Sequence, residues 1–180
     1  MIITHNSDQW SVLATQSQLC TFPLSQEDIT CIESLNKELD LLKNDAAAIA
    51  AIQIGYAKRI FVIQDTREVF INPVILSKSR VTRRLPEGCL SIPGFSVRIS
   101  RPKKIELQYF SIDGTMQQKT FSGFQAQVMS HELDHLEGKL IIDHLKEAPR
   151  SSKKTDQKIK AIHKRREKNK RAKKARALNR

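Results

Sequence analysis

His131-Glu132-Leu133-Asp134-His135 is the stretch that determines the central element of this chain. Residues four apart lie on one face of an α-helix, so His131 and His135 can point two imidazole nitrogens at one metal ion. Glu132 is next to the first of these ligands, where it can exchange protons with a water at the metal. Apolar residues at helical spacing surround the stretch and predict that it lies on an amphipathic helix: Phe124, Val128, Met129 and Leu133.

The two ends of this helix are also predicted. Ser122 and Gln125 have the spacing of a capping box, which opens a helix. Gly138 is the kind of residue at which helices stop. The alternative is an ordinary surface helix with two histidines, because the pattern occurs by chance in roughly one per cent of chains of this length. The helical context favours the metal site over that alternative.

A third ligand is available in Glu87-Gly88-Cys89-Leu90-Ser91. A thiolate from Cys89 would complete a three-ligand site and leave a fourth, tetrahedral position open for water or substrate. An open position is typical of catalytic metal sites, whereas structural sites are closed. The residues therefore predict a metal-assisted hydrolase.

Three motifs give the chain a resemblance to a known family. Residues 87–91 are an intact Glu-Gly-Cys-Leu-Ser, and residues 130–135 begin with Ser130 where the family has Gln-His-Glu-x-Asp-His. Residues 46–53 keep the Ala-Ala and Gln of Gly-x-Gly-hydrophobic-Ala-Ala-x-Gln, with Ala46 and Ala48 in place of both glycines. In this order, and over roughly residues 25–145, the chain resembles the peptide deformylase family.

The resemblance implies a fold and a reaction. The fold is α+β, with mixed or antiparallel sheets around the metal-binding helix, as strands without βαβ alternation also indicate. The reaction is removal of the formyl group from the N-terminal formylmethionine of nascent polypeptides. Glu132 would move the proton, and the oxyanion would be stabilised by the metal, the Gln53 side-chain amide and the Leu90 backbone N–H.

The same resemblance implies a cofactor and a substrate pocket. The cofactor is one divalent metal ion, usually Fe(II) in the family, and zinc, nickel or cobalt fits the same ligands. The residues implied at the pocket are Ala46, Ala47, Ala48, Leu85, Glu87, Phe124 and Val128. Gln127 stands where the family often has an apolar residue, which would alter specificity or turnover.

Asp134 is expected to form an ion pair with Arg101, which would anchor the strand beside Cys89 to the helix. The alternative is a solvated helix charge. Glu87 is placed to orient a metal ligand, with a plain surface carboxylate as the alternative. His144 lies outside the ligand spacing and is interpreted as structural.

Outside the motifs, the pattern predicts one further helix and several strands. Ser25 and Asp28 open the helix, which ends near residues 44–45. The resemblance implies that residues 46–53 are extended, although a run of alanines favours helix. The remaining elements are strands at 59–63, 69–73, 105–109, 115–120 and 140–145, a hairpin turn at 113–114 and a polar connection at 80–84.

Charge divides the chain into two parts. Residues 1–150 contain 17 basic and 17 acidic residues, whereas residues 151–180 contain 14 basic and 2 acidic residues and carry the whole net charge of +12. We expect a catalytic domain over 1–150 and a basic C-terminal helix or tail over 151–180, whose apolar residues, Ile159, Ile162 and Leu178, are too sparse to bury a face. Clustered Lys and Arg without aromatics imply contacts to the phosphate backbone of a polyanion, and the alternative is a solvated helix or tail without a partner. In several members of the resembling family, a basic C-terminal helix binds the ribosome, so the resemblance implies the ribosome or ribosomal RNA as the partner.

The cellular location is expected to be cytoplasmic. Three cysteines form no disulfide framework, and the N-terminus has no secretory signal pattern. The longest apolar run, residues 46–52, is too short to span a membrane.

Three hypotheses for function are open. The first is a ribosome-associated peptide deformylase. The second is a deformylase-like ribosome-binding protein with weak or no catalysis, which Ala46 and Ala48 favour because glycine permits closer backbone approach. The third is a zincin-type protease, but Cys89 argues against it because zincins use His or carboxylate as third ligand.

Overall fold

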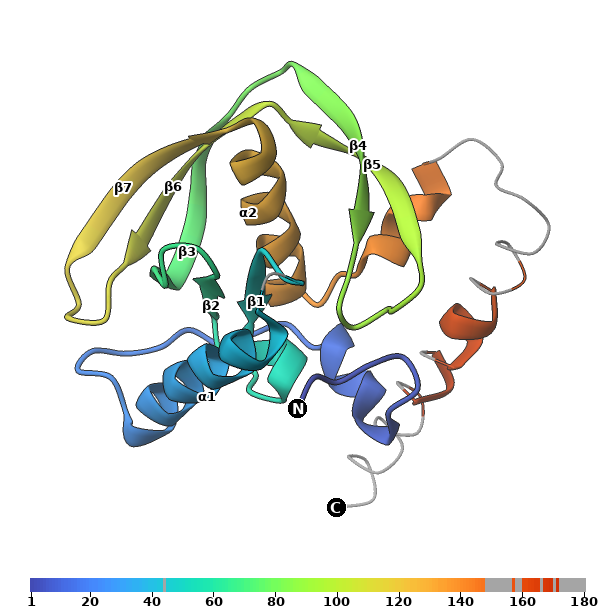
Figure 1. Ribbon diagram of the computed structural model, residues 1–180, viewed down its shortest axis with the longest axis horizontal. Coiled ribbons are helices and arrows are strands. Elements are labelled where there is room, and N and C mark those ends of the chain that lie inside the picture. The colour runs from blue at the N-terminus through green and yellow to red at the C-terminus, as the bar shows by residue number, and fades with distance from the viewer. Residues whose placement is uncertain (44, 148–156, 158–159, 166, 170, 172–180) are drawn as a thin grey trace.

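The structure is a computed structural model that describes residues 1–43, 45–147, 157, 160–165, 167–169 and 171. Helix α2 (Gly123–Leu136) lies at the centre, with a five-stranded sheet on one side and a two-stranded ribbon on the other (Figure 1). All pairs of neighbouring strands are antiparallel. The expected α+β fold, with antiparallel sheets around the metal-binding helix, is confirmed.

The five-stranded sheet separates two apolar layers. Its strands, in spatial order, are β1 (Ala48–Ala50), β2 (Ile60–Ile63), β3 (Val69–Lys78), β6 (Lys104–Phe110) and β7 (Met116–Ser122). Successive side chains of a strand point to opposite faces. Phe61 therefore packs in the cluster that contains Met129 of α2, whereas Val62 packs in the cluster that contains Leu35 on the other face.

Helix α1 (Gln26–Leu42) covers the face of the sheet opposite α2 (Figure 1). Its predicted capping box is present: the Ser25 hydroxyl accepts from the Asp28 backbone N–H, and the Asp28 carboxylate accepts from the Ser25 N–H. The helix ends at Leu42, close to the predicted end.

The first motif is extended, as expected, over β1 and then turns into the 3-10 helix η2 (Ala51–Ile54). Pairing with β2 overrides the helical preference of the alanines, because Ala48 to Ala50 lie opposite Ile63 to Phe61. β1 is the edge strand of the sheet, so its other side is open to a further strand.

The sequence pattern predicted a polar connection at residues 80–84. This prediction is wrong, because a strand begins at Thr82. β4 (Thr82–Gly88) pairs along its whole length with β5 (Ser96–Pro102) to form the two-stranded ribbon. Arg83 and Arg84 are exposed on this ribbon. Backbone pairing with β5 stabilises the strand, and its first residues, Thr82 to Arg84, are polar, so no apolar alternation marked it in the sequence.

The strand predicted at residues 140–145 is also wrong. The segment forms the 3-10 helix η3 (Ile141–Glu147), and the Asp143 carboxylate accepts from the Leu140 N–H at 2.9 Å. Leu140, Ile141 and Ile142 are all buried in one cluster, which a strand with alternating faces would not achieve.

The ends of α2 follow the prediction in part. Ser122 is the N-cap residue, but its side chain makes no capping hydrogen bond, because the residue still belongs to β7. Gly138 has φ +67°, and a Cβ there would lie 2.8 Å from the Ala14 backbone. The left-handed turn and the close approach both require glycine, so the predicted stop is confirmed. Among the described residues, no helix combines the length and apolar character needed to cross a bilayer.

The basic segment contacts the body at Ile162. Residues 160–165 and 167–169 are helical, and Ile162 is 6% exposed in the same cluster as Trp10 of the 3-10 helix η1 (Asp8–Ala14) and Leu140. The expectation that the sparse apolar residues of this segment would bury no face is wrong for Ile162. Ile159 and Leu178 lie outside the described residues.

Replacement of Ile162 by alanine is expected to lower the free energy of unfolding by about 2 kcal/mol, because it removes buried methyl groups and leaves a cavity beside Trp10. Urea denaturation followed by circular dichroism measures this change. Lys164→Ala, on the exposed side of the same helix, is the matched control and should leave the stability unchanged. Equal stability of the two variants would contradict the packing of Ile162.

Candidate metal centre and substrate pocket

Three ligand atoms converge between α2 and the ribbon. His131 and His135 lie on one face of α2, and Cys89 follows directly after β4. The Cys89 Sγ lies 3.4 Å from the His135 Nε2, and the ligand atoms of all three residues lie within 4.8 Å of one another. This spacing and the sulfur and nitrogen donor set suit a single tetrahedral metal ion.

The electrostatics of these residues favour metal binding. Burial alone would raise the pKa of the Cys89 thiol, but the imidazoles of His135 and His131 lower it to about 5. Burial opposes the charged form of His131, whereas its contacts with Cys89 and Glu87 raise the pKa of this histidine to about 10. A thiolate therefore faces the two histidines at neutral pH, and the thiolate is the form of cysteine that binds metals.

A buried network of charges orients His131. The Glu87 Oε2 lies 3.1 Å from the His131 Nδ1, and Arg101 donates to both oxygens of Glu87 at 2.9 Å. The expected contact between Arg101 and Asp134 is present at 2.6 Å. Burial alone would raise the pKa of the Glu87 carboxyl group, but its hydrogen bonds with His131 and Arg101 lower this pKa. Because an ionised carboxylate only accepts, the His131 Nδ1 carries the proton and its Nε2 is directed to the metal position.

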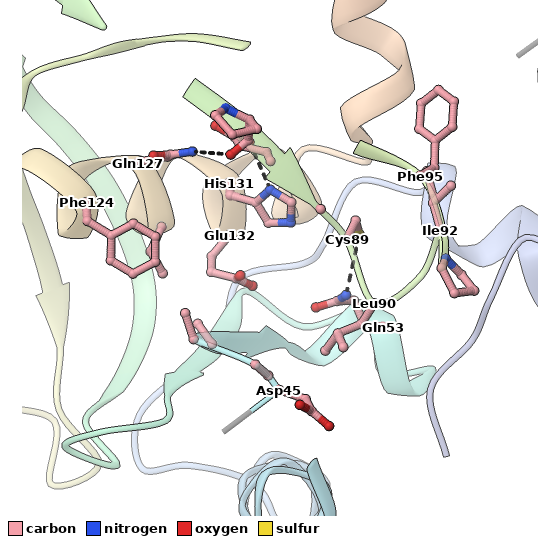
Figure 2. Close-up of a pocket in the computed structure, with 18 of the residues that line it drawn as sticks. Asp45, Gln53, Cys89, Leu90, Ile92, Phe95, Phe124, Gln127, His131 and Glu132 are labelled. Atoms are coloured by element: carbon pink, nitrogen blue, oxygen red, sulfur yellow. Dashed lines mark hydrogen bonds and ion pairs between the residues drawn. The ribbon is translucent and has the colours of Figure 1, made fainter. Parts of the chain in front are cut away.

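Glu132 points from α2 into the pocket (Figure 2). Its side chain is 3% exposed, and its Oε2 has no hydrogen-bond partner among the residues that the structure describes. Burial raises the pKa of this carboxyl group, although His131 and His135 act in the opposite direction. A buried carboxylate with an unpartnered oxygen is suited to accept a proton from a water in the pocket.

Gln53 approaches Cys89 from the opposite wall of the pocket (Figure 2). Its Oε1 accepts from the Ala50 N–H at 2.9 Å, which fixes the amide so that its Nε2 donates to the Ser91 hydroxyl at 3.2 Å and lies 4.0 Å from the Cys89 sulfur. The Leu90 N–H has no backbone acceptor among the described residues. Gln53 and Leu90 both line the pocket, with the Gln53 amide next to the Cys89 sulfur.

The pocket next to these groups has a volume of about 460 Å³. Six of the seven expected pocket residues line it: Ala46, Ala47, Ala48, Glu87, Phe124 and Val128. Leu85 does not line it; Pro86, the next residue of β4, does. Phe124 is 65% exposed, so a large apolar ring stands at the mouth (Figure 2).

Ala46 and Ala48, which replace the two glycines of the first motif, have backbone conformations that alanine readily adopts. Ala46 and Ala48 are not among the described non-glycine residues with positive φ, so neither is in a conformation that requires glycine. Both residues line the pocket, and Ala46 also packs against the cluster on the α1 side of the sheet. Gln127, 6% exposed, also lines it and donates to the Pro86 carbonyl at 3.2 Å, which connects α2 to β4.

Several residues of the site were not predicted from the sequence. Asp45, Ile92, Phe95 and Pro86 line the pocket, and Ser91 holds the Gln53 amide. Their positions next to the three motifs were the available signal. His144 contacts the Asp134 carboxylate at 2.6 Å, a role for which its spacing gave no signal.

Comparison with known proteins gives a consistent result. The family model described as "Polypeptide deformylase" matches residues 1–151. A peptide deformylase of Phenylobacterium zucineum is 36% identical over 149 residues, 74% of this chain and 85% of that protein. The peptide deformylase of Pelagibacter ubique is 41% identical over 110 residues, 57% of this chain and 64% of that protein, which is slightly less than two thirds of its length.

Solved structures agree with this result. The crystal structure of peptide deformylase from Ehrlichia chaffeensis superposes with a TM-score of 0.73 at 27% identity, over 93% of this chain and 97% of that one. The family match extends over the sheet, the ribbon and α2, and thus over every part that forms the site. The chain belongs to the polypeptide deformylase family.

Proposed function

We propose that this protein is a metal-dependent hydrolase that removes the formyl group from the N-terminal formylmethionine of nascent polypeptides. One observation carries the proposal: the convergence of Cys89, His131 and His135 beside the unpartnered carboxylate of Glu132 at a pocket. Membership in the deformylase family supplies the reaction class.

The residues divide the work of the reaction. Cys89, His131 and His135 would hold a divalent metal, which would supply Lewis acidity toward the formyl carbonyl and the attacking water. Glu132 accepts a proton from the attacking water and later returns it to the amine that leaves, so that formate and a free N-terminus result. Gln53 Nε2 and the Leu90 N–H donate hydrogen bonds to the oxyanion that develops on the carbonyl oxygen.

The open edge of β1 is the proposed binding site of the substrate peptide. β1 pairs with β2 on one side only, and Ala46 to Ala48 line the pocket at this edge. An extended peptide can add to such an edge as a further strand, because its backbone groups find partners there. The methionine side chain then lies against Val128 and Phe124.

Fe(II) is the proposed native metal. The donor set of one thiolate and two imidazoles accepts Fe(II), zinc, nickel and cobalt, and selection among them depends on geometry and availability. The usual metal of the family favours iron.

The ribosome is the proposed place of action, reached in the cytoplasm through residues 151–180. Fourteen basic residues against two acidic ones in this segment suit a polyanionic surface. The three cysteines are free thiols in the structure, which agrees with a reducing compartment.

A second candidate is a deformylase-like ribosome-binding protein with weak catalysis. The methyl groups of Ala46 and Ala48 favour it, because they occupy space at the edge where the peptide would pair. The retained ligands and Glu132 favour the enzyme, and turnover measurements distinguish the two.

The metal-free protein is expected to bind one divalent ion with release of about one proton at pH 7. Cys89, with a pKa of about 5, has already lost its proton, whereas His131, with a pKa of about 10, must lose the proton on Nε2. Affinity should fall as the pH is lowered below about 10, where His131 is protonated, and more steeply below about 5, where the Cys89 thiolate is protonated as well. Calorimetry in buffers of different ionisation enthalpy counts the protons.

Cys89→Ser and His135→Ala are the controls for this binding and should retain little metal. Release of two protons by the wild type would mean that Cys89 is a thiol in the metal-free protein. Stoichiometric metal in either variant would contradict the ligand set.

The anaerobically purified protein is expected to release formate from formyl-Met-Ala-Ser, and Glu132→Gln should lower kcat by about 10³-fold, because the proton acceptor is lost. Glu33→Gln, on the exposed surface of α1, is the matched control and should be fully active. A wild type no faster than Glu132→Gln with metal present would favour the binding protein over the enzyme.

The double variant Ala46→Gly/Ala48→Gly is expected to raise kcat/KM for formylated peptides by about threefold, because it clears two methyl groups from the edge of the pocket. Steady-state kinetics with peptides of different length measure the gain, which should be larger for peptides that extend along β1. An unchanged or lower kcat/KM would refute the proposal that Ala46 and Ala48 reduce the turnover of formylated peptides.

Truncation after Arg171 is expected to weaken co-sedimentation with ribosomes and to make its dependence on salt shallower. It removes four basic residues, and each lost phosphate contact reduces the salt slope by about 0.9. The truncation keeps Ile162, so turnover of short peptides should not change. A full-length variant with glutamine at Lys37, Lys78, Lys103 and Lys104 is the charge-matched control on the body. Equal co-sedimentation of the wild type and both variants would refute the anchor.

A further inference from the structure

We propose that His144 is a positioning residue for the metal centre, which acts on His131 through Asp134, Arg101 and Glu87. The proposal rests on the metal centre of the proposed function. It assigns a role in ligand orientation to a histidine that neither binds the metal nor lines the pocket.

Local structure brings His144 to α2. The Asp143 carboxylate accepts from the Leu140 N–H and closes the first turn of η3. The apolar residues of this turn are buried, which fixes η3 against the body. His144, the next residue after Asp143, is thereby held with its Nε2 at 2.6 Å from the Asp134 Oδ2.

Two donors hold the same oxygen of Asp134. Arg101 donates to the Oδ2 at 2.6 Å, and His144 lies at the same distance from it. The guanidinium of Arg101 forms an ion pair with Asp134, which is therefore a carboxylate. Because an ionised carboxylate only accepts, the His144 Nε2 must carry the proton of this hydrogen bond. Such charge-assisted bonds are short and strong, and two of them fix the carboxylate.

The fixed carboxylate extends the network to the metal position. Arg101 uses one nitrogen for Asp134 and two for Glu87, and Glu87 in turn contacts the His131 Nδ1 at 3.1 Å. The guanidinium group is planar and rigid, so the bond of one nitrogen to Asp134 also fixes the orientation of the two nitrogens that bind Glu87. The orientation of the His131 ring therefore depends on contacts that begin at His144.

The surroundings of Asp134 explain why the contact with His144 matters. Asp134 and Arg101 both line a second cavity, of about 430 Å³, which shares no lining residue with the substrate pocket. The Asp134 side chain is 19% exposed. Without His144, this carboxylate would keep one protein donor and could turn toward water in the cavity, which would loosen the hold of Arg101 on Glu87.

The test compares His144→Phe with His144→Gln. Phenylalanine fills the space without a donor, whereas glutamine can still donate to Asp134. The metal-free proteins are titrated with Co²⁺ against a chelator, and the visible spectrum of the bound ion reports its geometry. Mutation of a residue that hydrogen-bonds a metal ligand typically lowers metal affinity by about 10- to 100-fold. His144 lies further from the ligands, so we expect about a fivefold loss of Co²⁺ affinity in His144→Phe.

Glutamine is expected to restore most of the affinity and the wild-type spectrum. The matched control is His163→Phe, since the His163 side chain is 30% exposed, similar to 24% for His144, and also lies near an aspartate, Asp143. This control should bind Co²⁺ as the wild type does.

Two outcomes would overturn the proposal. In one, His144→Phe has the affinity and the spectrum of the wild type. In the other, phenylalanine and glutamine lower affinity equally and both lower the melting temperature of the metal-free protein, which is the pattern of a merely structural role. A wild type that binds no Co²⁺ would instead refute the metal centre itself, and with it both the proposed function and the role of His144.

Discussion

The clamp of Arg101 between Glu87 and Asp134 is the interaction on which the site depends. Glu87 belongs to the ribbon and Asp134 to α2, so one guanidinium joins the element that carries Cys89 to the element that carries the histidines. All three side chains are largely or partly buried. Removal of one partner from such a buried charge network typically costs about 3–5 kcal/mol, because the remaining charges lose their compensation. The clamp thus determines both stability and the approach of the thiolate to the imidazoles.

The same principle of compensation applies at the ligands themselves. In the metal-free protein, the Cys89 thiolate faces protonated imidazole, and each charge stabilises the other against burial. The three side chains that could hold a metal ion are thus also coupled electrostatically to one another.

Much of the fold and of the centre followed from short-range patterns. Helical spacing predicted α2 and the shared face of its histidines, and the motifs predicted Cys89 as their neighbour. The errors have a common cause, because they concern segments whose state is decided by partners distant in sequence. β4 is a strand because β5 pairs with it, and the predicted strand at residues 140–145 is instead a 3-10 turn because Leu140, Ile141 and Ile142 are buried in one cluster. A short apolar run does not by itself distinguish strand from helix. Ile162 is a similar case, since a single side chain is buried by the N-terminal helix and η3.

The position of β1 at the edge of the sheet has a consequence for solubility. An open strand edge offers unpaired backbone groups to any passing chain, including a second copy of the same protein, and is a common origin of aggregation. Here the open edge is only three residues long and is ended by the turn into η2. The opposite edge, β7, is longer, but its exposed side chains are mainly polar and include Lys119. Charged residues of this kind are a usual defence against edge-to-edge association. The sheet thus leaves an edge accessible only where a short peptide is the proposed partner, and protects the edge that has no such partner.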